Sequence, residues 1–268
     1  MTLDDSTTFP FTYAGATRTM YPQGAGPAVI ILHVLPGMIP EVIDVARRVV
    51  YAGFTAYLPH LFGEPGRKLS NRYICQQFVN VCLRREFYVF AARKSSPITE
   101  WLRALCRRAH AQCGGPGVGA VGMCFTGGFA LSLVVDPSVM APVLSQPSLP
   151  MLALTKARKA ALGISPEELA VARERVRAGV RVLGLRFTQD ALCPRERFDT
   201  LRHELGDGFE AVEIDSSPSN PHGIPPDAHG VLTNHFVDRE GHPTREALDR
   251  VLALFRERLT SPTTPATR

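Results

Sequence analysis

Short apolar runs alternate along this chain with longer segments in which apolar residues recur every three or four positions. The run 29–32, VIIL, is apolar throughout, which is typical of a strand buried on both faces. The next segment, 40–51, begins with Pro and places its apolar residues on one side of a helix: Val42, Val45, Ala46 and Val49. Gly53 ends this helix, and a second strand is predicted at 54–58.

The same alternation continues toward the C-terminal end. Further strands are predicted at 118–122, 139–144, 180–187 and 209–214, although Pro142 interrupts the second of these. Helices are predicted twice within 71–112, the second beginning at Ser96 and Pro97, and then at 125–135, 166–178, 194–205 and 243–259. Strands that alternate with helices predict an α/β protein with a mostly parallel central sheet and helices on both faces.

The length of 268 residues fits one large domain. Residues 1–26 are expected to form an irregular N-terminal lead-in, and 27–260 a single α/β domain with a helical insertion around 67–112. Residues 261–268 are expected to form a flexible tail.

Composition and charge limit the kinds of molecule that this protein is expected to bind. The net charge of +5 is mild and the basic residues are spread along the chain, so we expect no nucleic-acid partner. No stretch reaches the roughly 18 apolar residues of a membrane helix, and the acidic N-terminus is no signal peptide, which predicts a cytoplasmic protein with no membrane partner. The six cysteines form no C-x-x-C pair or zinc spacing, so we expect no metal site, and in the cytoplasm their thiols should be reduced. The sequence does not indicate an oligomeric state.

Reactive side chains follow several predicted strands, at the sheet edge where parallel α/β proteins place their sites. Cys124 follows the strand 118–122, Asp190 follows 180–187, and His229 lies beyond a long loop after 209–214. This is the order nucleophile, acid, histidine of α/β-hydrolase triads. In such a triad, the histidine would activate the Cys124 thiol and Asp190 would orient the imidazole.

The residues around Cys124 are typical of a nucleophile elbow, the tight strand-to-helix turn that exposes a nucleophile. Gly122 lies two residues before Cys124, but Gly127 lies three residues after it, and Thr126 stands where the usual pattern has glycine. A cysteine at a helix N-terminus has a lowered pKa. The backbone N–H groups of Phe125 and Leu35 are the predicted oxyanion hole.

Other residues compete for these roles. His222 and His235 are alternatives to His229, and Asp199 and Asp215 are alternatives to Asp190. His33 is expected to bond the loop backbone rather than to act in catalysis. The histidines at 222, 229, 235 and 242 are spaced unlike a metal site.

Four segments together resemble the dienelactone hydrolase family of α/β hydrolases: 32–37, 122–124, 188–190 and 228–232. The resemblance covers about residues 27–258 and implies a Cys-Asp-His triad that hydrolyses a small carboxylic ester or lactone without a cofactor. The prototype enzymes have a Glu that takes part in activating the cysteine, where this chain has Val34, and an Arg for the substrate carboxylate, where it has Thr233.

Two other functions fit the same residues. One is an inactive α/β-hydrolase scaffold that binds a small ligand or a partner protein. The other is acyl transfer to an acceptor other than water. Rapid labelling of Cys124 by a thiol reagent near neutral pH would separate a catalytic cysteine from a buried structural one.

Overall fold

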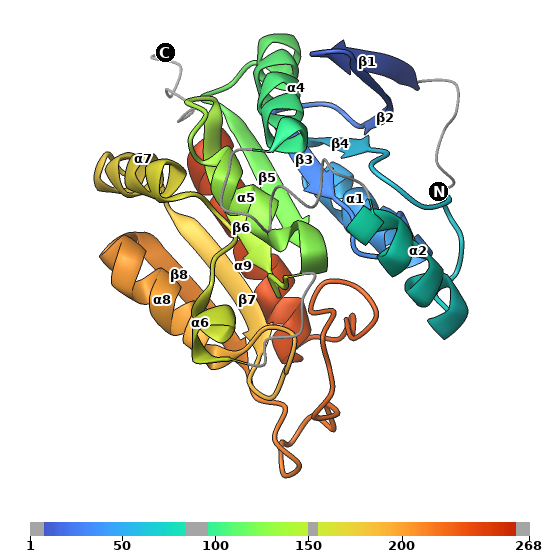
Figure 1. Cartoon of the computed structure of the whole chain (residues 1–268), viewed down its shortest axis with the longest axis vertical. Coiled ribbons are helices and arrows are strands. Elements are labelled where there is room, and N and C mark those ends of the chain that lie inside the picture. The colour runs from blue at the N-terminus through green and yellow to red at the C-terminus, as the bar shows by residue number, and fades with distance from the viewer. Residues whose placement is uncertain (1–7, 84–95, 150–154, 261–268) are drawn as a thin grey trace, which may run out of the picture.

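The central element of the computed structural model, which describes residues 8–83, 96–149 and 155–260, is one eight-stranded sheet with the order β1-β2-β4-β3-β5-β6-β7-β8 (Figure 1). Strands β3 to β8 are parallel, and β1 and β2 join the edge beside β4 in antiparallel pairs. The strands are β1 (Phe9–Tyr13), β2 (Ala16–Gln23), β3 (Ala28–Leu32), β4 (Thr55–Pro59), β5 (Val118–Met123), β6 (Val139–Ser145), β7 (Val182–Phe187) and β8 (Phe209–Ile214).

Alternate residues of the parallel strands pack into different hydrophobic clusters, so both faces of the sheet are covered. In β3, Val29 and Ile31 pack with helices α1 (Pro40–Tyr51) and α9 (Pro243–Leu259), while Ile30 and Leu32 pack with α4 (Pro97–Cys113). Successive side chains of a strand point to opposite faces, which places α1 and α9 on one face and α4 on the other. Every residue of β3, β4, β5 and β7 is buried, which explains why these strands are apolar except at Thr55 and Arg186. These observations confirm the predicted α/β fold.

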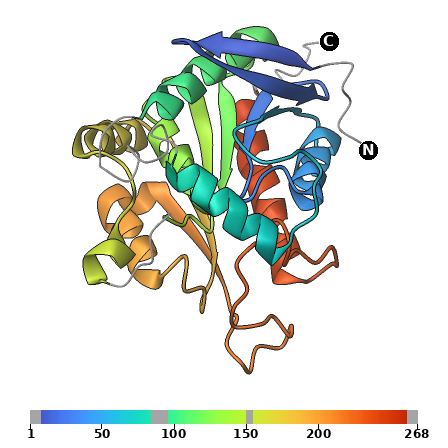
Figure 2. The same ribbon diagram turned by 45° about the vertical axis from the view of Figure 1, so that its right-hand side comes forward.

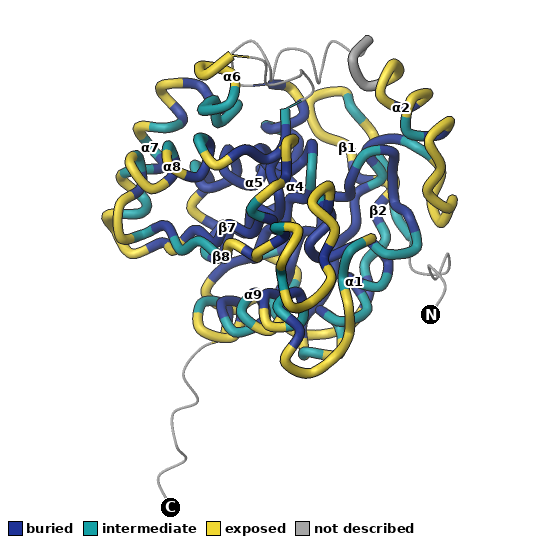
Figure 3. The backbone as a smooth tube through the Cα atoms, turned by 90° about the horizontal axis from the view of Figure 1, so that it is seen from below, coloured by how far each residue is buried: buried dark blue, intermediate teal, exposed yellow. Residues whose placement is uncertain are grey.

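The remaining helices complete the layer on the α4 side. Helix α5 (Gly127–Leu133) follows β5 and contacts both α4 and α7 (Pro166–Arg177), and α7 contacts α8 (Arg195–Leu205). Figure 2 shows α9 in red behind the strands and α2 (Asn71–Leu83) crossing in front of them. In Figure 3 the central strands are dark blue, while exposed residues gather on the outer turns of α2, α7 and α8. No helix in the described ranges is long and apolar enough to cross a membrane.

Most predicted helices begin at the caps that the sequence suggests. The Ser96 hydroxyl accepts a hydrogen bond from the Thr99 N–H at the start of α4, and Ser165 and Glu168 form a reciprocal capping box at the start of α7. The helix expected at 125–135 begins as a 3-10 turn, Cys124–Thr126, before α5. A short helix at Lys156–Ala160, α6, was not predicted. The predicted tail at 261–268 and part of the predicted insertion, 84–95, lie outside the described residues.

The prediction of an irregular lead-in is wrong for residues 9–23, which form the β1–β2 hairpin. Its turn residues Ala14 and Gly15 both have positive φ, at 48° and 79°, as a tight hairpin turn requires. Trp101 on α4 fixes the hairpin, because its indole N–H donates to Ala16 O at 3.0 Å and its ring meets Phe11 edge-on at 5.1 Å. The sheet therefore extends two strands beyond the predicted boundary at residue 27.

Candidate active site

The fold brings Cys124, Asp190 and His229 together at the carboxyl ends of β5 and β7. His229 Nδ1–H donates to Asp190 Oδ2 at 2.7 Å, and the charge of Cys124 raises the pKa of the imidazole. His229 Nε2 is buried and has no conventional hydrogen-bond partner in the described ranges, which leaves it available to the Cys124 thiol. These are the three residues that the sequence places beyond the ends of predicted strands.

Cys124 sits in a strained turn at the end of β5. Its φ is +57°, a left-handed conformation that residues with a Cβ rarely adopt. The turn also requires glycine at position 122, since a Cβ there would lie 2.3 Å from Thr126 O and 2.9 Å from Gly127 Cα. Both contacts are to backbone, which cannot rotate away. This geometry is that of a nucleophile elbow, with the cysteine thiol at its apex.

Thr126, which departs from the usual glycine pattern, has a defined role in the elbow. Its hydroxyl oxygen accepts the Met123 N–H at 3.0 Å and lies 3.0 Å from Leu32 O and 3.2 Å from His33 O. The single hydroxyl hydrogen can be donated to one of these two carbonyls or to Met123 O, which is also 3.0 Å away. Thr126 thus ties the elbow to the strand that precedes the predicted oxyanion loop.

The electrostatics of Cys124 and His229 favour a thiolate and an imidazolium. Burial acts to raise the pKa of Cys124, but His229, the Ser148 hydroxyl and the Phe125 backbone N–H together hold that pKa below its ordinary value. Burial also acts to lower the pKa of His229, but Cys124 and the hydrogen bond to Asp190 outweigh it and raise that pKa. Each group therefore stabilises the charged form of the other.

The loop that carries Asp190 is held by two buried arginines. Arg186 donates to Thr188 O at 2.8 Å and to Cys193 O at 3.0 Å, on either side of Asp190. Arg197 donates to Leu192 O at 3.1 Å, and the Leu192 N–H donates to Asp190 Oδ1 at 2.9 Å. The carboxylate is 4% exposed and both its oxygens are bonded, so its orientation toward His229 is fixed.

His33 has the structural role expected from the sequence. It is fully buried, the Leu61 N–H donates to its Nε2 at 3.1 Å, and its Nδ1–H donates to Val34 O at 3.0 Å. This neutral tautomer joins the loop after β3 to the loop after β4. Burial lowers the pKa of His33 to about 3.

We expect the buried His33 to make the protein less stable in acid. The unfolded chain takes up a proton below the ordinary value of 6.5 and the folded chain only near 3, so the free energy of unfolding falls as pH drops between these values. The slope from this group is about 1.4 kcal/mol per pH unit. Urea unfolding across this range should show a shallower decline for His33→Gln. A constant offset between the two proteins at every pH would contradict the assignment.

The two residues predicted to supply the oxyanion hole flank the elbow. Phe125 follows Cys124 directly, and its backbone N–H acts on the thiol. Leu35 lies in the loop after β3, held by the His33 bonds, and packs in the hydrophobic cluster that also contacts Cys124. The Phe125 N–H thus lies in the elbow and the Leu35 N–H in the loop after β3, and the Thr126 hydroxyl contacts both segments.

Sequence reasoning missed the roles that three residues have in organising the site. Ser148 Oγ lies 3.3 Å from Cys124 Sγ. His235 Nδ1 accepts the N–H groups of His229 and Gly230, each at 3.2 Å, so this competitor for the triad instead orders the loop that carries His229. Gln146 Oε1 accepts from the Ser145 hydroxyl and from the Val231 N–H. No local pattern marks these residues, because each acts through a partner brought near by the fold.

The other residues that the sequence offers for the triad lie outside the site. Asp199 pairs with arginines on α8, and Asp215 accepts from Ser217 in the loop after β8. His222 packs its ring against His242, with 5.3 Å between centroids. Within the described residues, no three or more His, Cys, Asp or Glu side chains are grouped as metal ligands.

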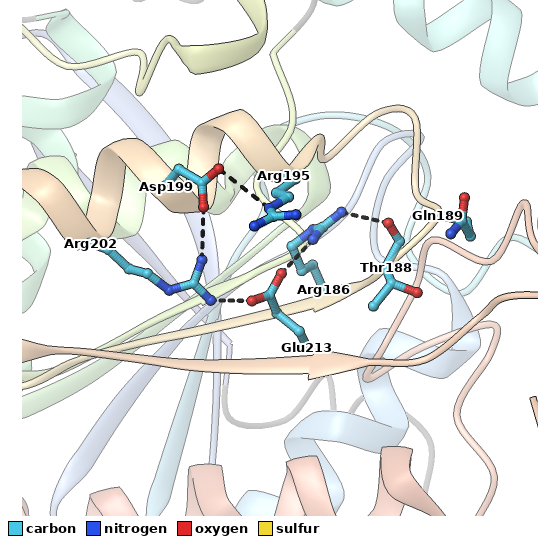
Figure 4. Close-up of a pocket in the computed structure, with 7 residues that line it drawn as sticks. All are labelled: Arg186, Thr188, Gln189, Arg195, Asp199, Arg202 and Glu213. Carbon is cyan, nitrogen blue, oxygen red and sulfur yellow. Dashed lines mark hydrogen bonds and ion pairs between the residues drawn. The ribbon is translucent and has the colours of Figure 1, made fainter.

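A cavity of about 660 Å³ opens near the carboxyl ends of β7 and β8, close to the Asp190 loop (Figure 4). Its charged side chains pair with one another: Arg186 and Arg202 contact Glu213, and Arg195 and Arg202 contact Asp199. Cys124, Asp190 and His229 do not line it. The cavity is lined by Arg186, Thr188, Gln189, Arg195, Asp199, Arg202 and Glu213.

The parallel sheet, the elbow and the Asp–His pair define an α/β hydrolase. The model of the dienelactone hydrolase family matches residues 16–259, and this chain belongs to that family of hydrolases acting on ester bonds. No curated protein sequence matches the chain.

Solved structures share the fold at low sequence identity. A protein of Klebsiella pneumoniae assigned as a dienelactone hydrolase is 18% identical, with a TM-score of 0.61 over 93% of this chain and 97% of that one. A dienelactone hydrolase-like promiscuous phosphotriesterase from metagenomic libraries is 17% identical, with a TM-score of 0.62 over 94% and 97%. A cold-adapted esterase from an Arctic intertidal metagenomic library is 14% identical, with a TM-score of 0.56 over 94% and 93%.

Proposed function

We propose that this protein hydrolyses a small carboxylic ester or lactone with a Cys124–Asp190–His229 triad. The observation that carries the proposal is the thiol at the apex of the elbow beside an imidazole whose Nδ1–H is bonded to a buried carboxylate 2.7 Å away. The triad supplies a nucleophile, a proton carrier and an orienting group without a cofactor. The cytoplasmic location expected from the sequence remains a prediction.

The reaction follows from this arrangement in two halves. The Cys124 thiolate attacks the carbonyl carbon, and the backbone N–H groups of Leu35 and Phe125 stabilise the oxyanion. The C–O bond breaks, the leaving alkoxide takes the proton of the His229 imidazolium, and a thioester remains on Cys124. His229 then removes a proton from water as the water attacks the thioester, and the thiolate is expelled.

The substrate is proposed to be uncharged near the reacting carbonyl. Val34 and Thr233, which stand where the family prototypes have Glu and Arg, are 6% and 4% exposed. Val34 packs in the hydrophobic core, and the Thr233 hydroxyl bonds Asn234. These two positions therefore offer no charge to bind a substrate carboxylate.

The proposal is tested by looking for the thioester directly. Wild-type protein is mixed with p-nitrophenyl acetate, quenched in acid and digested, and we expect an acetyl group on the Cys124 peptide together with release of p-nitrophenol and acetate. A panel of small lactones and esters, with and without a carboxylate, then defines the substrate, with the neutral members turned over faster. Absence of both turnover and acetylation would favour the inactive scaffold. Transfer of the acetyl group to an added alcohol or amine in preference to water would favour acyl transfer.

A further inference from the structure

A serine hydroxyl lies beside the proposed nucleophile and belongs to no part of the triad. Ser148 Oγ is 3.3 Å from Cys124 Sγ, and Ser148 is 7% exposed. A sulfur–oxygen separation of this length is a hydrogen bond. Its direction decides what the serine does: a hydroxyl that donates stabilises the thiolate, whereas one that accepts stabilises the thiol.

The segment that carries Ser148 is fixed against the elbow by its backbone. The Ser148 N–H donates to Cys124 O at 3.0 Å. The preceding residue, Pro147, packs so closely on Gly127 that a Cβ at Gly127 would lie 2.6 Å from Pro147 Cα. The hydroxyl is therefore held at the sulfur by contacts that do not involve the serine side chain.

A buried arginine holds the same segment from behind. Arg197 is 2% exposed and donates to Pro147 O at 2.6 Å and to Leu192 O at 3.1 Å. Because the Leu192 N–H bonds Asp190, one guanidinium connects the segment beside the nucleophile to the loop of the acid. Arg197 is thus a positioning residue for both sides of the site.

The proposed ion pair gives the direction of the serine bond. In the ion pair, His229 carries both ring protons and the sulfur carries none, so the sulfur can only accept. We propose that the Ser148 hydroxyl donates a hydrogen bond to the Cys124 thiolate and is a fourth functional group of the site, an inference that rests on the proposed function. The lowered pKa of Cys124, to which His229 is the larger contributor, is in keeping with this bond.

The hydroxyl then acts in both halves of the reaction without transferring its proton. It stabilises the thiolate before attack, and it loses that interaction when sulfur becomes neutral in the thioester. When water attacks the thioester and the C–S bond breaks, the hydroxyl donates again to the departing thiolate. A thiol with a lower pKa is the better leaving group, so the serine favours deacylation.

The test is the pH profile of Cys124 alkylation in Ser148→Ala. Iodoacetamide labelling is followed by mass spectrometry of the Cys124 peptide, with the exposed Cys75 in the same sample as an internal reference. We expect the midpoint for Cys124 to rise by about one pH unit, the effect of one hydrogen bond to a charged group. Deacylation after a burst with p-nitrophenyl acetate should slow as well. The backbone tie from the Ser148 N–H remains in the variant.

Ser132→Ala is the matched control. Ser132 is also buried, on helix α5, but its hydroxyl has no hydrogen-bond partner in the described part of the chain. This variant should leave the Cys124 midpoint in place. An unchanged alkylation midpoint in Ser148→Ala would overturn the inference, because the serine would then have no effect on the thiolate. A lowered midpoint would also overturn it, because the serine would then stabilise the thiol.

Failure of the proposed function would be visible in the wild type alone. In that case wild-type Cys124 would alkylate no more readily in mild acid than Cys75, and no acetyl group would accumulate on it. If wild-type Cys124 is reactive but its alkylation midpoint is the same in Ser148→Ala, the proposed triad is retained. Only the proposed role of Ser148 is then rejected.

Discussion

Replacement of Cys124 by Ala should reduce ester hydrolysis by at least about a thousandfold, to the background rate of the buffer. The residual groups of the site, His229 and the oxyanion N–H donors, have no nucleophile to activate once the sulfur is gone. The measurement is steady-state release of p-nitrophenol by wild-type and variant protein at equal concentration. The exposed Cys75 provides the matched control, because Cys75→Ala removes a thiol of the same kind outside the site and should retain full turnover.

The stability of the Cys124 variants shows whether activity is lost because the nucleophile is missing or because the protein is less stably folded. Cys124 holds φ at +57°, which costs an L-residue about 1–2 kcal/mol and costs glycine little. Cys124→Gly should therefore be more stable to urea than Cys124→Ala by about 1 kcal/mol, while both are inactive. Equal turnover in wild type and Cys124→Ala would exclude the thiol as the nucleophile.

Replacement of Asp190 by Asn should lower kcat by about a thousandfold or more, although the two side chains have the same shape. The Leu192 N–H donates to Asp190 Oδ1, so the amide oxygen of Asn stays with that donor and the NH₂ group faces His229. His229 Nδ1 must then accept, and its proton moves to Nε2, on the side of the thiol. In this tautomer the imidazole cannot take a proton from Cys124.

The Asp190→Asn substitution should also raise the pKa of the Cys124 thiol. Without the carboxylate the imidazolium is less stable, so the alkylation midpoint of Cys124 rises toward that of an ordinary cysteine. Asp199→Asn is the control, since Asp199 pairs with surface arginines on α8 and should leave both kcat and the midpoint unchanged. A variant at Asp190 that keeps wild-type turnover would remove this residue from the triad.

The strained turn at Cys124 also explains the unusual sequence around it. Elbows of this kind need small residues where backbone segments meet, and Gly122 and Gly127 supply them by contacting Thr126 and Pro147. Thr126 stands where the common pattern has glycine, and its hydroxyl lies within hydrogen-bond distance of Leu32 O and His33 O at the end of β3. The departure from the motif therefore leaves the turn intact and adds a contact.

The order and type of most elements could be predicted from the sequence because their cause is local. Strands buried on both faces must be apolar throughout, as β3 and β5 are, and helices with a serine cap and a following proline begin where those residues lie, as α4 does. The hairpin β1–β2 escaped prediction because it lies at the sheet edge. Its strands are partly exposed and contain Pro10 and Pro22, and its Ala14–Gly15 turn lacks the usual Asn-Gly signal.

The candidate triad could be predicted for a topological reason. Parallel strands end at the same edge, so residues that directly follow β5 and β7 must lie near one another once the fold class is known. The order of Cys124, Asp190 and His229 along the chain then restricts the choice. The sequence by itself thus determined the fold class and selected the three side chains that the fold brings together.

Only the tertiary structure decided what surrounds those side chains. The contacts of Ser148 with Cys124, of His235 with the His229 backbone and of Arg197 with both loops depend on how segments after β6, β7 and β8 turn beyond the sheet. Such turns have no periodic pattern, and a hydrogen bond within them requires positions accurate to a fraction of an ångström. Of these contacts, only that of Ser148 acts on the pKa of Cys124, and it lowers that pKa together with His229, which has the larger effect.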